Sequence, residues 1–101
     1  MYTLIGLQET VARKGPWIAR IHKPASRLCV RLIVNRWGSL TTGNAAEKKW
    51  ARKRIVEDVS RAYPAATWVI QILVSVIIKW LMSRRFLGVD QTIDRVRAES
   101  E

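Results

Sequence analysis

A long uncharged stretch in the second half of the chain constrains the fold most. Residues 62–78 contain no charged side chain, and residues 65–82 add only Lys79. As a helix, the 18 residues 65–82 would be roughly 27 Å long at ~1.5 Å per residue. A hydrocarbon core is about 30 Å thick, so this stretch approaches the length of one membrane span. We therefore expect a transmembrane helix over about 65–87.

Both ends of this stretch carry side chains typical of membrane–water boundaries. Trp68 and Trp80 flank its most apolar part, and tryptophan rings favour the head-group level of a bilayer. Arg84 and Arg85 follow, where they would meet lipid phosphates. We predict that these four residues are interfacial anchors. Lys79 can reach the head groups through its flexible stem.

The polar residues within the stretch recur at intervals of four, at Thr67, Gln71, Ser75 and Lys79. On a helix they form one slowly winding stripe. In a membrane such a stripe allows hydrogen bonds between helices, worth about 0.6–2 kcal/mol each. We therefore expect a homo- or hetero-oligomer that associates through this stripe. Two alternatives stay open. In the first, the stripe is the solvent-exposed side of a helix that lies on a membrane surface or on a soluble core. In the second, the β-branched residues of this stretch form a buried strand.

The rest of the chain is strongly basic. The formal net charge is +10, and residues 1–64 hold thirteen Lys or Arg against four acids. With 101 residues, one domain with a small core is the most that we expect. The composition divides the chain into a basic, surface-associated helical region at 1–64, a hydrophobic membrane helix at 65–87 and a polar tail at 88–101. The charge favours anionic partners.

Residues 26–37 are expected to form a basic amphipathic helix. Ser26 is placed to cap its first turn, and Gly38 suits the position that follows a helix end. Leu28–Val34 is apolar and partly β-branched, so a short strand is the competing interpretation. The expected fold class is all-α.

A second basic helix is expected over 45–62, after a loop. Asn44 followed by Glu47 resembles a capping box, and Pro64 should end the helix. Opposite charges four residues apart should form ion pairs within it, each worth a few tenths of a kcal/mol. These pairs are Lys53–Glu57, Arg54–Asp58 and Glu57–Arg61.

Basic side chains interleaved with tryptophan form the main candidate binding surface. The expected anion-binding residues are Arg27, Arg31, Arg36, Lys48, Lys49, Trp50, Arg52, Lys53 and Arg54. They suit an anionic lipid surface, and equally the phosphates and exposed bases of nucleic acid. They can also be a solvated face without a ligand. The residues of this set between Lys48 and Arg54 form a cluster shortly before the expected span, so lipid is the preferred partner.

Catalytic and metal-binding signatures are absent from the sequence. We find no nucleophile elbow, P-loop, dinucleotide-binding or zinc-protease motif, so we expect no enzyme and no cofactor. One cysteine, Cys29, and one histidine, His22, cannot form a disulfide or complete a zinc site. We expect Cys29 to be a small apolar helix residue, with palmitoylation as an alternative.

The sequence therefore favours a small, basic, single-span membrane protein with a structural or interaction role. From the excess of Lys and Arg before the span, we expect the N-terminal part on the cytoplasmic side. One alternative is a membrane-permeabilising protein, similar to holins or bacteriocins in size and charge only. The other is a helical, soluble nucleic-acid-binding protein in which the apolar helix forms a core.

Overall fold

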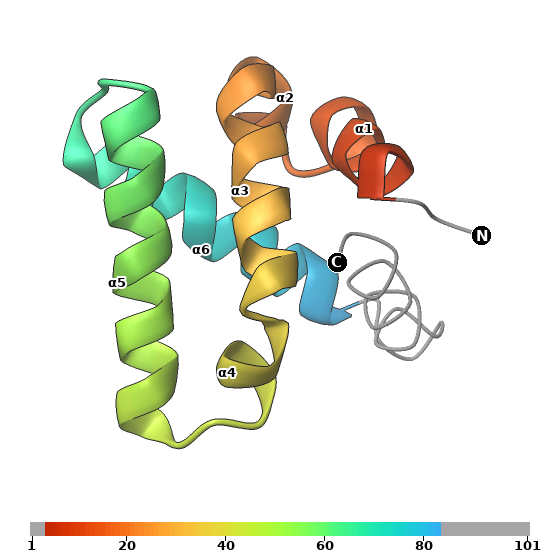
Figure 1. Cartoon of the computed structure of the whole chain (residues 1–101). Helices are drawn as coiled ribbons and strands as arrows, with labels where there is room; N and C mark the ends of the chain where they lie inside the picture. Colours follow the sequence, from red (N-terminus) through yellow and green to blue (C-terminus); the bar gives the residue numbers. More distant parts are fainter. Residues whose placement is uncertain (1–3, 84–101) are drawn as a thin grey trace.

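The structure is a computed structural model, and it describes residues 4–83 (Figure 1). Every regular element among these residues is a helix, which confirms the all-α fold class. The helices are α1 (Leu4–Lys14), α2 (Trp17–Ile21), α3 (Lys23–Asn35), α4 (Trp37–Thr41), α5 (Ala45–Ala62) and α6 (Thr67–Ser83). Helix α3 lies between α1 and α5, and α6 crosses α3 and α5 (Figure 1). The polar tail at 88–101 lies outside the described residues.

Helix α3 differs from the expected helix at both ends. It begins at Lys23 because Pro24 lies in the first turn, where the missing N–H of proline has no helical partner to lose. Ser26 is therefore not a cap. It is buried, and its hydroxyl oxygen lies 2.8 Å from the carbonyl oxygens of both Ala19 and His22. The strand interpretation of this segment is wrong.

The C-terminal end of the expected 26–37 helix is also corrected. Helix α3 ends at Asn35, and Arg36 leaves the helical geometry with φ −114° and ψ 20°. Trp37 then begins α4, so Gly38 lies inside a short helix and does not terminate one. The ring of Trp37 is buried in the core. Burial of this large aromatic ring favours the break between the two helices. The sequence around residue 37 contains no local signal for this break.

Helix α5 has the expected bounds. The side-chain oxygen of Asn44 accepts a hydrogen bond from the backbone N–H of Glu47 at 2.9 Å, which confirms the cap. The helix ends at Ala62, two residues before Pro64. The predicted ion pairs four residues apart are wrong, because the pairs that form are three residues apart. Arg54 pairs with Glu57 at 3.7 Å and Arg61 with Asp58 at 4.0 Å, each three residues apart rather than four.

Helix α6 contributes its apolar side to the core of the protein. Six of its residues are at most 2% exposed: Ile70, Leu73, Val74, Ile77, Ile78 and Leu81. They pack in one cluster with buried residues of α1, α3 and α5, including Val11, Ile33 and Ile55. Among residues 4–83, none of the helices has both the length and the apolarity that crossing a membrane requires. The transmembrane part of the expectation is therefore unsupported.

Candidate anion-binding groove between α5 and α6

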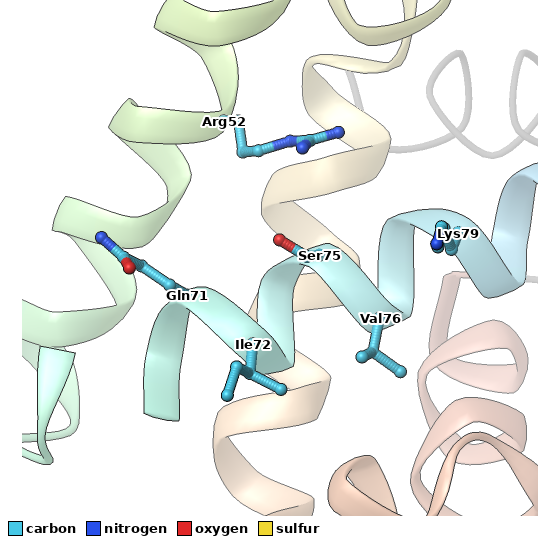
Figure 2. A pocket seen from close by; sticks show the side chains of 6 residues that line it. All are labelled: Arg52, Gln71, Ile72, Ser75, Val76 and Lys79. Atoms are coloured by element: carbon cyan, nitrogen blue, oxygen red, sulfur yellow. The ribbon is translucent and has the colours of Figure 1, made fainter. Parts of the chain in front are cut away.

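A groove runs between α5 and α6. It consists of two adjoining cavities of about 410 and 540 Å³ that share Arg52, Gln71 and Ser75. Figure 2 shows the first of these cavities. We call the residues that line either cavity the α5–α6 groove. They are Lys49, Arg52, Lys53, Val56, Glu57, Thr67, Gln71, Ile72, Ser75, Val76 and Lys79.

The α5 wall of the groove is cationic. Lys49, Arg52 and Lys53 lie three and four residues apart, so their side chains share one face of the helix. All three are exposed, and none forms an ion pair with another residue of the described chain. The opposite side of α5 carries Ala51 and Ile55, which are fully buried. Burial of that side fixes the rotation of α5 and directs the cations into the groove.

The α6 wall is formed by the polar stripe. Thr67, Gln71, Ser75 and Lys79 all line the groove, because the apolar side of α6 faces the core. In Figure 2 the Gln71 amide extends toward α5. The Ser75 hydroxyl points to the side of α6 on which the Arg52 side chain lies. The structure thus brings the stripe and part of the predicted basic set together. Their roles stay predictions.

The electrostatic balance of the groove is positive. Four cationic side chains line it against one carboxylate, that of Glu57. Oε2 of Glu57 lies 3.7 Å from the Arg54 guanidinium, so its charge is already partly neutralised by a residue outside the groove lining. The cations are exposed, so salt screens their attraction for an anion. The groove suits an anionic ligand whose binding weakens at high ionic strength.

Apolar side chains lie beside these charges on the outer side of α6. Trp68 is 65% exposed and Ile72 is 42% exposed. Because positions 68, 72, 75 and 79 follow at helical spacing, these two side chains lie on the same side of α6 as Ser75 and Lys79. We call this surface, together with the groove, the α5–α6 face. It combines cations, hydrogen-bonding groups and an exposed tryptophan.

The remaining predicted site residues are dispersed. Arg27 pairs with Glu9 of α1 at 2.7 Å, and Arg31 is exposed on α3. The Arg36 guanidinium lies 4.9 Å from the centre of the Trp50 ring, which joins the end of α3 to α5. Lys48 and Arg54 are exposed on α5 outside the groove.

The four predicted membrane anchors also separate. Trp68 is exposed, whereas Trp80 is half-buried and packs against the core. Arg84 and Arg85 lie outside the described residues. The two tryptophans therefore differ in exposure, and the role of all four residues as anchors stays a prediction.

A second surface was not predicted from the sequence. Trp17 and Ile21, four residues apart on α2, are 65% and 64% exposed. Ile21 lines an apolar cavity of about 390 Å³ that also contacts Tyr63, Val69 and Leu73. The spacing of Trp17 and Ile21 was the available signal. Pro16 and Pro24 flank this segment, and proline discourages a continuous helix, so the spacing alone does not predict one.

Cys29 and His22 occupy different environments. Burial raises the pKa of the Cys29 thiol to about 12, so it behaves as an apolar core residue. His22 is exposed and joins α2 to α3. The described residues contain no cluster of His, Cys, Asp and Glu that could hold a metal ion. No protein-family model, curated protein or solved structure matches the chain.

Proposed function

We propose that the protein binds the surface of anionic membranes through the α5–α6 face, as a binding protein without catalytic activity. The observation that carries this proposal is the exposure of Trp68 and Ile72 beside the cations of the groove. Each Lys or Arg near an anionic leaflet contributes about 1 kcal/mol, and tryptophan settles at the head groups. Cations without acidic partners and an exposed tryptophan on one face support both contributions at once.

The proposed mode of binding is peripheral. A spanning α6 would have to withdraw six buried apolar side chains from the core, including Leu73 and Ile77. Peripheral binding leaves that core intact and uses only side chains that are already exposed or half-exposed. In this mode the polar stripe contacts lipid head groups. It does not form the pairing with another helix that the sequence led us to expect. The permeabilising alternative would require α6 to leave the core.

Co-sedimentation with vesicles tests the proposal. Wild-type protein should bind vesicles that contain phosphatidylglycerol, should bind much less to pure phosphatidylcholine, and should be released by salt. The triple variant Lys49→Gln, Arg52→Gln, Lys53→Gln should bind roughly a hundredfold more weakly, from about 1 kcal/mol per lost charge. Dye leakage, measured on the same vesicles, should be absent.

The matched control is the triple variant Lys14→Gln, Lys23→Gln, Arg31→Gln. These side chains are exposed on α1 and α3 and form no ion pair within the described chain, so the same charge is lost elsewhere. Its binding should fall by much less than that of the groove variant. Equal losses in both triples would mean that net charge alone drives binding. No binding of the wild type to anionic vesicles would overturn the proposal.

Nucleic acid is the second candidate partner. The observation that favours it is the mixture of cations and neutral hydrogen-bonding groups on facing walls, which suits a phosphate backbone. Binding would be independent of base sequence, because the sequence contains no recognised groove-reading motif. Salt-sensitive retention of DNA or RNA in a gel, lost in the groove triple and without vesicle binding, would favour this candidate over lipid.

A further inference from the structure

Arg52, Gln71 and Ser75 occupy a distinctive place within the α5–α6 groove, because they alone line both of its cavities. Arg52 comes from α5, and the other two come from successive turns of α6. Figure 2 shows the Arg52 side chain crossing above the turn that carries Ser75, with Gln71 directed toward α5. Three side chains with hydrogen-bond donors thus line the groove where the two helices face each other.

These three side chains supply the donors that a phosphate group requires. The guanidinium of Arg52 offers a planar pair of N–H groups that matches phosphate oxygens. The Gln71 amide and the Ser75 hydroxyl add neutral donors. None of the three forms a side-chain hydrogen bond or ion pair with another described residue, so their donors are available to a ligand.

The surroundings of this trio favour an anion further. Lys49 and Lys53 stand on the same face of α5, and Lys79 lies one turn beyond Ser75 on α6. Each cavity has a volume within the range of about 300–1,000 Å³ that is usual for small-ligand sites. Ser75 is half-buried, which lowers the competition from water for the hydrogen bond that it donates.

We propose that Arg52, Gln71 and Ser75 form a binding site for a single phosphate group, supplied by an anionic phospholipid head group. This inference rests on the proposed function for the source of the phosphate, but the site itself is defined by the side chains. The site adds a discrete, saturable contact to the attraction between the α5–α6 face and the membrane. Without the site, that attraction would depend only on the density of charge.

Nuclear magnetic resonance titrations test the site in two arms. In the first, inorganic phosphate is added to the full chain, with chloride at matched ionic strength as the reference. We expect saturable shifts of the Gln71 side-chain amide, the Ser75 backbone amide and the Arg52 Nε–H, beyond those caused by chloride. In the second arm, dihexanoyl-phosphatidylglycerol below its micelle concentration should shift the same resonances.

The variants are Arg52→Gln, Ser75→Ala and, as the control, Arg61→Gln, which removes one positive charge from α5 outside the groove together with the ion pair to Asp58. We expect at least tenfold weaker phosphate binding for Arg52→Gln, a smaller loss for Ser75→Ala, and little change for Arg61→Gln. Thermal unfolding curves establish that each variant is folded. If Arg52→Gln unfolds, the comparison of folded Ser75→Ala with folded Arg61→Gln still tests the site.

The outcomes separate the site from the proposed function. Identical shifts with phosphate and chloride, or equal losses in Arg52→Gln and Arg61→Gln, would overturn the site even if anionic vesicles still bind. Saturable phosphate binding without any response to phosphatidylglycerol would overturn the lipid source. It would then identify the site as one for a free or nucleic-acid phosphate. Saturable, Arg52-dependent shifts in both arms would support the inference as stated.

Discussion

The Nε of Arg27 on α3 donates a hydrogen bond to Oε1 of Glu9 on α1, at 2.7 Å. A second, longer contact of 3.4 Å joins Nη2 of Arg27 to Oε2 of Glu9. The two side chains are 39% exposed, so the pair lies at the edge of the α1–α3 interface. Arg27, which the sequence predicts to bind anions, is thus already paired with a carboxylate of the protein.

A double-mutant cycle measures what this pair contributes. Exposed ion pairs typically contribute about 0.2–1 kcal/mol. We expect a coupling free energy of that size for Glu9→Gln and Arg27→Met, from urea denaturation of the two single variants and the double variant. Vesicle binding by Arg27→Met should equal that of wild type. A coupling near zero would mean that packing and the hydrogen bond from Gln8 Nε2 to the Arg27 carbonyl oxygen, at 3.1 Å, hold α1 on α3 without this ion pair.

Replacing Ser26 with alanine should destabilise the fold more than a surface substitution. The Ser26 hydroxyl is fully buried and lies 2.8 Å from the carbonyl oxygens of Ala19 and His22, at the junction of α2 and α3. Losing a buried donor typically costs about 1–3 kcal/mol. Chemical denaturation should show a loss of this size, whereas Ser39→Ala should change stability by less. Equal effects would contradict the structural role of the Ser26 hydroxyl.

The Cys29 thiol should react slowly in the folded protein. Its pKa is raised from 9.0 to about 12 by burial, so at pH 8 the thiolate fraction is about a thousandfold smaller than for an exposed thiol. Labelling by a thiol reagent should accelerate sharply in denaturant. Because this is the one cysteine of the chain, the readout is unambiguous. Rapid labelling under native conditions would show that α3 is accessible.

The same shift has a consequence for stability at high pH. Because the pKa is raised on folding, the unfolded chain loses the thiol proton first, and stability falls as pH rises from 9.0 toward about 12. Between pH 8 and pH 10, the wild type should lose about 1 kcal/mol of unfolding free energy relative to Cys29→Ala. Parallel pH profiles of the two proteins would contradict the burial of Cys29.

Trp68 should contribute to membrane binding, whereas Trp17 should not. Both rings are 65% exposed, on α6 and α2 respectively, so the two alanine variants form a matched pair. We expect Trp68→Ala to weaken binding to phosphatidylglycerol vesicles roughly tenfold, from about 1.4 kcal/mol of lost interfacial contact. Equal losses for Trp17→Ala would place the α2 surface on the membrane as well.

Local signals were sufficient to predict α5 but not α3. Asn44 caps α5, and Pro64 follows two residues after its end, so both boundaries depend on neighbouring residues. At the start of α3, Pro24 lies in the first turn, where proline fits a helix, so α3 begins three residues before the predicted start at residue 26. The buried hydroxyl of Ser26 depends on a contact with Ala19, which only the packing of α2 on α3 creates.

The role of α6 was harder to predict, because apolar side chains bury equally well in lipid and in protein. The pattern separated its polar stripe from the residues that prove to be buried, such as Leu73 and Ile77. It carried no information on what would cover them. The groove was also beyond the sequence. The sequence predicted the basic residues of α5 and the polar stripe of α6 separately. That Arg52 and Ser75 line one groove depends on how α5 and α6 cross.

Cysteine accessibility in the absence of lipid and detergent tests most directly whether α6 is a core helix with an exposed polar stripe. In a Cys29→Ala background, Gln71→Cys and Ile77→Cys place one thiol on each side of α6. A charged, water-soluble maleimide should label position 71 at the rate of an unfolded peptide and position 77 at least a hundredfold more slowly. Equal rates at the two positions in a folded protein would contradict the account.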